Sequence, residues 1–241
     1  MKPAVLDYPK SDNLGDYVQT IAAKMMLSED PISIDREKLN SYSGTPACLI
    51  MNGWFMENPK NWPPSTQITP LFVSFHINPT VAKQMTSPAS IAYMKRHEPI
   101  GCRYLYTTEL LISKGIKAYF SGCLTLTLNR EIFLKNTNQS KSILVISVLE
   151  RLKPKRVKWK NKDNLVLLGS QWLKYPFKNV KYKRAMRRVD RFLVTQPETV
   201  IKRSQIISNP NIPPAQKETL AMEQLQAIAS AKLVITSRIH S

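Results

Sequence analysis

The sequence predicts an α/β fold organised in two units, and two observations carry this prediction. Short apolar runs alternate with segments of helical periodicity along the first half of the chain, which is typical of a parallel sheet with crossover helices. A polar stretch then separates this half from a second apolar run at 143–149, the expected first strand of another α/β unit. Of the 241 residues, 43% are hydrophobic, enough for a packed core.

The first half is expected to contain five strands and three helices. Leu14, Val18 and Ile21 recur at helical spacing, and Asp12 or Asn13 is a suitable N-cap for a helix over 14–25. Helices are also expected at 88–96 and 107–114. Strands are expected at 4–6, 47–51, 71–77, 100–102 and 117–120, the second of them stopped by Asn52-Gly53.

The second half divides less clearly. We predict an N-terminal domain at 1–130, a polar linker at 131–141 and a second domain at 142–241. Further strands are expected at 143–149, 164–169, 191–194 and 233–236, and a helix at 214–231, with Pro214 in its first turn. The last strand is followed by only five residues where a crossover helix normally comes. We therefore expect the second domain to be incomplete in this chain.

The positive charge is concentrated in one segment. The chain carries 35 Lys and Arg against 17 Asp and Glu, a net charge of +18, and residues 151–191 hold 15 of these bases with only two acids. Such a segment favours anions. Aromatic residues interleave with the bases, but no nucleic-acid-binding motif accompanies them, so nucleic acid is not the expected partner. A solvated face, or a patch that attracts anionic substrates or lipid head groups, is the preferred interpretation.

Cysteine usage and the N-terminus predict a cytoplasmic protein. Cys48, Cys102 and Cys123 are odd in number and lack metal-ligand spacing. The N-terminus has no apolar segment typical of a secretion signal. No apolar run approaches the length that spans a bilayer.

The first candidate binding site lies where the first strand leads into the first helix. Ligands of α/β proteins bind at the carboxyl ends of strands, and free N–H groups at a helix start suit an anion. Asn13, Gly15 and Asp16 occupy this place. An ordinary capped helix explains the same residues, and neither a Walker motif nor GxGxxG is present.

Two further candidates also follow strands. Arg103 comes directly after the strand at 100–102 and could bind a carboxylate or phosphate, or form a surface ion pair. Ser237, Arg238 and His240 follow the strand at 233–236. Arg238 and His240 lie on one side of an extended segment and combine a fixed charge with a proton donor or acceptor. A frayed chain end is the alternative interpretation. His76 and His97 lack partners at metal-ligand spacing.

Five blocks in order resemble the polysaccharide pyruvyl transferase family. They lie at 13–23, 51–55, 99–103, 118–128 and 231–241, the last ending in Ser-Arg-Ile-His-Ser. The resemblance implies two Rossmann-like domains in a glycosyltransferase-B-like arrangement, the second truncated here. Such enzymes transfer the enolpyruvyl unit of phosphoenolpyruvate to a polysaccharide sugar, forming a pyruvate ketal.

The resemblance also implies roles for the candidate residues. Arg238 would bind the phosphate or carboxylate of phosphoenolpyruvate, and His240 would act as the acid/base group. Asn13, Asp16 and Arg103 would lie on the side of the glycan or lipid-linked saccharide acceptor. No metal or organic cofactor is implied, because protein charges suffice for this chemistry.

Two departures from the family pattern bear on activity. Tyr104 stands where the family usually has an Asp, and the chain ends at Ser241 although the family continues beyond the Arg-x-His motif. Both departures leave the activity of this chain an open question. Two alternatives remain open: a nucleotide-sugar glycosyltransferase of the same fold, and a non-catalytic protein that binds anions, including an anionic membrane surface, through its basic segment.

Overall fold

The computed structural model describes residues 1–134, 140–154 and 165–237 of the chain. These residues fall into two compact units. The first contains 1–132 together with 206–225, and the second contains the described residues of 133–205 together with 226–237. Residues 206–225 thus pack with the N-terminal part of the chain, whereas the sequence-based division assigned everything after 141 to the second domain.

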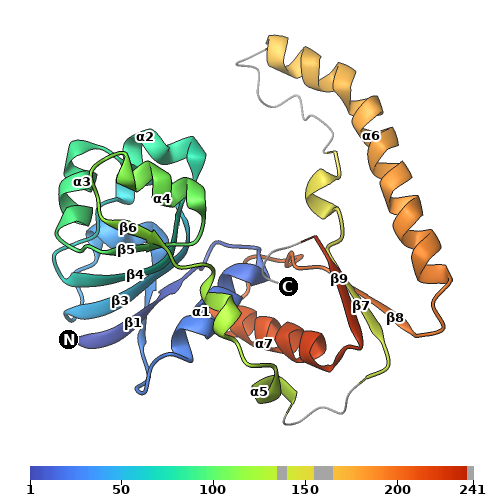
Figure 1. Cartoon of the computed structure of the whole chain (residues 1–241), viewed down its shortest axis with the longest axis horizontal. Coiled ribbons are helices and arrows are strands. Elements are labelled where there is room, and N and C mark those ends of the chain that lie inside the picture. The colour runs from blue at the N-terminus through green and yellow to red at the C-terminus, as the bar shows by residue number, and fades with distance from the viewer. Residues whose placement is uncertain (135–139, 155–164, 238–241) are drawn as a thin grey trace. The chain divides into compact units, whose positions relative to one another are not determined.

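The first unit is built on a six-stranded parallel sheet (Figure 1). The strand order is β2-β1-β3-β4-β5-β6, so β3 and β4 are the central strands of the sheet. The strands are β1 (Lys2–Asp7), β2 (Ile32–Asp35), β3 (Ala47–Phe55), β4 (Ile68–Ile77), β5 (Ile100–Cys102) and β6 (Ala118–Phe120). All pairs in this sheet are parallel, as the alternating pattern predicted.

Two helices of this unit begin after residues whose side chains satisfy free N–H groups. Asn13 caps α1 (Leu14–Lys24), and Ser87 caps α3 (Pro88–Lys95), which also has Pro88 in its first turn. The remaining helices are α2 (Ala82–Met85) and α4 (Leu105–Ile112), and a short helix, α5 (Arg130–Leu134), lies where a linker was predicted. The predicted helices at 14–25, 88–96 and 107–114 are confirmed within a few residues.

Strand β3 is longer than predicted. Asn52-Gly53 does not stop it, because the chain forms a bulge there: the pairing with β4 shifts register between Met51 and Gly53. Gly53 has a φ of +86°, which glycine adopts without a steric penalty. The strand β2 was not predicted, since the alternation of Ile32-Ser33-Ile34-Asp35 covers only four residues.

The second unit contains a three-stranded parallel sheet of order β8-β7-β9. Its strands are β7 (Ile143–Ile146), β8 (Val200–Arg203) and β9 (Leu233–Thr236), and all four residues of β7 are buried. One face of β7 packs with Val189 and Leu193 of α6 (Leu165–Val194). The other face packs with the end of α7 (Pro214–Ser230).

Two predicted strands of the second half are wrong. Residues 165–169 and 191–194 both lie in α6, a single helix of 30 residues. Short apolar runs do not distinguish a strand from a buried helix segment. The many polar and basic residues between the two runs gave no sign that one helix continues through both. The predicted helix at 214–231 and strand at 233–236 are confirmed. The chain is therefore a mixed α/β protein, and the arrangement of two Rossmann-like domains stays a prediction.

Candidate functional site

The candidate site of the first unit lies at the carboxyl edge of its parallel sheet. Strands β1, β4 and β5 end at Asp7, Ile77 and Cys102, and their carboxyl ends meet at the same edge because all strands run in one direction. This edge is where ligands of open α/β sheets bind. The segments that leave it supply the polar side chains described below.

Asn13 and Gly15 form the start of α1. The side-chain oxygen of Asn13 accepts a hydrogen bond from the N–H of Gly15 at 3.2 Å, and Gly15 itself is buried. Asn13 therefore satisfies one of the free N–H groups of the helix start. This geometry matches the capped-helix interpretation of these residues, and their predicted role in substrate binding stays a prediction.

Asp16 is the candidate carboxylate of this edge. Its Oδ2 accepts a hydrogen bond from the hydroxyl of Ser11 at 2.6 Å. Burial raises the pKa of Asp16, while the hydrogen bond from Ser11 and the positive charges of Arg36 and Arg103 act in the opposite direction. The structure thus brings Asp16 within the electrostatic range of Arg103, a residue 87 positions further along the chain.

Arg36 is a residue of this edge that the sequence did not single out. Only 3% of it is exposed, and its guanidinium lies 4.9 Å from the centre of the Tyr8 ring and 5.0 Å from that of the Trp54 ring. Glu37 pairs with its Nε at 2.7 Å, and the carbonyl of Trp54 accepts from its Nη1 at 3.1 Å. No local pattern marks Arg36, because its partners come from three different segments.

Arg103 is held at the end of β5. Its backbone N–H donates to the carbonyl of Phe75 at 2.9 Å, and the residue is 8% exposed. Its guanidinium carbon lies 4.8 Å from the centre of the Tyr104 ring. The aromatic face of Tyr104 thus contacts the guanidinium, at the position where the resemblance leads us to expect an Asp.

His76 lies beside this pair. Its ring packs edge-on against Tyr104 at 4.6 Å, and its Nδ1 is 2.9 Å from the hydroxyl of Thr107. Burial and then the charge of Arg103 lower the pKa of His76 to about 4. The imidazole is therefore neutral at pH 7 and serves as a hydrogen-bonding group.

Two buried polar atoms of this edge have no hydrogen-bond partner among the described residues. They are the hydroxyl oxygen of Tyr8 and the side-chain carbonyl oxygen of Asn52. The bulge places Gly53 against Tyr8, because a Cβ at Gly53 would lie 3.2 Å from that hydroxyl. Unsatisfied buried groups are rare in native proteins and call for an explanation such as a binding function. The Asn-Gly pair in an apolar run was the signal for this feature, but it had been interpreted as a strand end.

The candidate residues at the chain's end are only partly described. Ser237 follows β9, and its hydroxyl donates to the carbonyl of Ser147 at 3.0 Å while it accepts from the N–H of Leu149 at 2.9 Å. Ser237 therefore joins the end of β9 to the loop after β7. Arg238 and His240 lie outside the described residues, as do Lys155, Arg156 and Lys158 of the basic segment.

Within the described residues, no group of three His, Cys, Asp or Glu side chains is arranged to hold a metal ion. Among the same residues, no helix combines the length and the apolar character needed to cross a bilayer.

Comparison with protein families decides the classification. The model of the polysaccharide pyruvyl transferase family matches residues 13–241. The chain belongs to the polysaccharide pyruvyl transferase family. The match begins at Asn13, the cap of α1, and includes Asp16, Arg36 and Arg103 of the candidate edge. Searches of curated proteins and of solved structures returned no significant match. Membership confirms the predicted family and indicates a transferase of polysaccharide biosynthesis.

Proposed function

We propose that the chain transfers the enolpyruvyl unit of phosphoenolpyruvate to a sugar of a polysaccharide or of its lipid-linked precursor. The observation that carries the proposal is the family match, which extends over 13–241 and so includes Asp16 and Arg103 of the sheet edge as well as the Arg-x-His motif. Arg238 is proposed to bind the phosphate or carboxylate of phosphoenolpyruvate, and His240 to act as the acid/base group.

The proposed reaction balances without a redox partner. Protonation of carbon 3 of the enol makes carbon 2 electrophilic, and a sugar hydroxyl attacks it. A second hydroxyl of the acceptor attacks the same carbon as phosphate leaves, which gives a pyruvate ketal. One of the two hydroxyl protons replaces the proton consumed at carbon 3, and the other protonates the released phosphate. Fixed positive charge near the phosphate stabilises the leaving group.

The sheet edge of the first unit supports a role as the acceptor side. Asp16 accepts a hydrogen bond from Ser11, and its raised pKa makes it a stronger base than an ordinary carboxylate. Such a carboxylate suits a sugar hydroxyl. The unpartnered oxygens of Tyr8 and Asn52 add a donor and an acceptor of the kind that bind sugars. Asn13, Gly15 and Arg103 complete the proposed acceptor site, and Ser237 belongs to the proposed phosphoenolpyruvate side.

The decisive experiment separates donor binding from transfer. Purified protein is titrated with phosphoenolpyruvate in a calorimeter, and phosphate release is then followed with a panel of glycans. We expect phosphoenolpyruvate to bind, and Arg238→Ala to weaken binding by roughly 10–100-fold, as for a lost charge-assisted hydrogen bond. The matched control is Arg96→Ala, an exposed arginine that packs on Tyr93 outside the candidate edge.

The outcomes distinguish the alternatives. Stabilisation by nucleotide sugars without binding of phosphoenolpyruvate would assign the chain to nucleotide-sugar glycosyl transfer instead. If neither nucleotide sugars nor phosphoenolpyruvate bind, and Arg238→Ala behaves like the wild type, the proposal of an active enzyme is contradicted. We also propose a cytoplasmic location, since Cys48, Cys102 and Cys123, all within the described residues, form no disulfide.

A further inference from the structure

Helix α6 presents a surface that the proposed function does not use. Figure 1 shows it as the long helix of the second unit. Its inner side is fixed by Val189 and Leu193, which pack against β7. Val180 is nine residues before Val189, about two and a half helical turns, so it lies on the opposite side. The outer side of α6 is therefore the side opposite Val189 and Leu193, which face the core.

The outer side carries apolar side chains that are more than half exposed to solvent. Leu173, Phe177 and Val180 recur at spacings of four and three residues and so share a face. They are 70%, 78% and 57% exposed. A solvent-exposed triad of this size on one helix face is a mark of an interaction surface.

The same helix is strongly basic. Residues 173–191 contain eight Lys or Arg and one acid, Asp190, which pairs with Lys202 at 3.3 Å. None of the seven bases at 174–188 forms an ion pair with another described residue. Lys174, Lys178 and Lys181 repeat the spacing of the apolar triad one position along. Arg184, Arg187 and Arg188 follow on the next turns, so positive charge borders the apolar triad.

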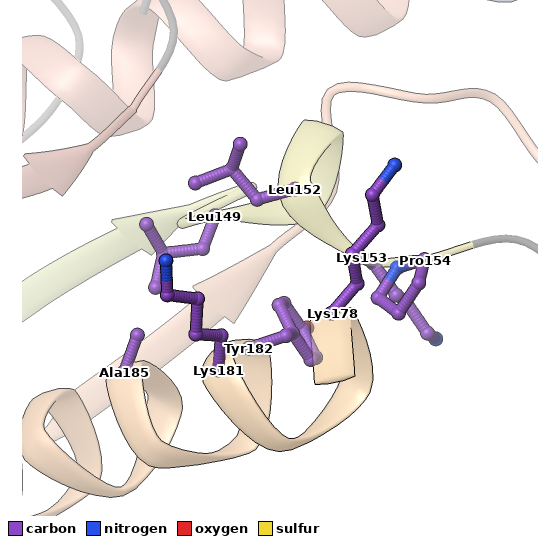
Figure 2. Close-up of a pocket in the computed structure, with 8 residues that line it drawn as sticks. All are labelled: Leu149, Leu152, Lys153, Pro154, Lys178, Lys181, Tyr182 and Ala185. Atoms are coloured by element: carbon purple, nitrogen blue, oxygen red, sulfur yellow. The ribbon is translucent and has the colours of Figure 1, made fainter. Parts of the chain in front are cut away.

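A cavity beside Lys178 and Lys181 also combines apolar and basic side chains. It lies between α6 and the turn η5 (Glu150–Leu152), and its volume is about 680 Å³. Figure 2 shows the stems of Lys153, Lys178 and Lys181 around it. Its other walls are apolar or aromatic, among them Leu152 and Tyr182. Lys178 and Tyr182 are eleven and seven residues before Val189, so they share its side of the helix and the cavity does not belong to the outer side.

We infer that the outer side of α6 docks on a membrane surface that contains anionic phospholipids. The apolar triad would enter the boundary between head groups and acyl chains, and the flanking bases would contact lipid phosphates. Nucleic acid fits this surface less well, because Leu173 and Val180 have no ring to stack on a base. The inference does not depend on the proposed pyruvyl transfer, since it concerns side chains outside the candidate site.

The test is sedimentation of the full chain with vesicles. One set contains equal parts of phosphatidylcholine and phosphatidylglycerol, and the other contains phosphatidylcholine alone. We expect binding to the anionic vesicles that falls as sodium chloride rises, and little binding to the neutral ones. The triple variant Arg184→Glu, Arg187→Glu, Arg188→Glu should lower partition by at least about 100-fold, given roughly fivefold for each basic side chain near an anionic leaflet.

Two matched variants make the result specific. Lys83→Glu, Lys95→Glu, Lys114→Glu changes the net charge equally at exposed sites of the first unit and should leave partition nearly unchanged. Phe177→Ser with Val180→Ser keeps every charge and should weaken binding to anionic vesicles by at least about 10-fold, from the apolar area lost. Circular dichroism confirms that each variant is folded.

Three results would overturn the inference. The first is equal binding to anionic and neutral vesicles, and the second is an equal loss in the control triple variant. The third is tight binding of RNA or DNA that the α6 variants abolish while vesicles remain unbound.

Discussion

The ammonium group of Lys217 lies 2.9 Å from the carbonyl oxygen of Ser11, and 2.7 Å from that of Pro9. Lys217 is fully buried, and it belongs to the segment of α7 that packs with the first unit. Ser11 in turn donates its hydroxyl to Asp16. Lys217, far along the chain, thus holds the loop whose Ser11 orients the carboxylate of Asp16 at the sheet edge.

Replacing Lys217 by Met should loosen this loop. The change removes the ammonium group, so the carbonyl oxygens of Pro9 and Ser11 lose the hydrogen bonds that it donates. This should lower the free energy of unfolding by ~1–3 kcal/mol. The same variant should weaken glycan binding at the sheet edge if Asp16 contacts the acceptor. Denaturant unfolding measures the first effect.

The neighbouring residue provides the control for Lys217. Glu218 pairs with Lys24 at 2.7 Å, and about a third of each side chain is exposed. Glu218→Gln should therefore cost only ~0–1 kcal/mol. An equal loss in both variants would show that the buried ammonium has no special role.

His76 should make the protein acid-sensitive. Its pKa is lowered to about 4 in the fold against an ordinary value of 6.5, so between these values the unfolded chain binds more protons at this residue. Its contribution to stability is complete above pH 6.5 and is lost as the pH falls towards 4. The melting temperature of His76→Gln should fall less than that of the wild type over this window. Parallel curves for the two proteins would contradict the assignment.

Tyr104→Asp should raise the pKa of His76. The change replaces the ring that packs on the imidazole by a carboxylate, which favours the imidazolium form and offsets the charge of Arg103. Titration of His76 followed by NMR would show the midpoint moving from about 4 towards 6.5. Tyr104→Phe keeps the ring and should leave the midpoint in place. A midpoint unchanged by the carboxylate would mean that residue 104 does not control the electrostatics of Arg103 and His76.

Gly101→Ala should destabilise the sheet. A Cβ at Gly101 would lie 2.9 Å from the carbonyl oxygen of Phe72, a backbone atom that cannot move without β4. We expect a loss of ~1–3 kcal/mol, as for an overpacked core. Gly44→Ala is the control, because a Cβ there would meet only side-chain atoms of the half-buried Tyr42, whose ring can rotate away. Melting curves of the two variants test the difference.

The sequence by itself determined the elements whose signals are local. The cap Asn13 and the apolar spacing after it predicted α1, and the apolar runs predicted β1, β4, β7 and β9, because side-chain period and capping chemistry act within a few residues. The ordered blocks from Asn13 to the Ser-Arg-Ile-His-Ser end also determined the family, which the match over 13–241 confirms.

Only the tertiary structure decided which of these residues meet. Arg36 lies between Tyr8 and Trp54, His76 contacts Tyr104, and Lys217 binds the Pro9 and Ser11 carbonyls. It also decided that 165–194 is one helix, whose described side chains from Leu173 on include exposed apolar and basic ones. Contacts between distant segments depend on strand order and on packing, which no local pattern encodes. The sequence therefore identified the family and the candidate residues, and the packing of distant segments determined their surroundings.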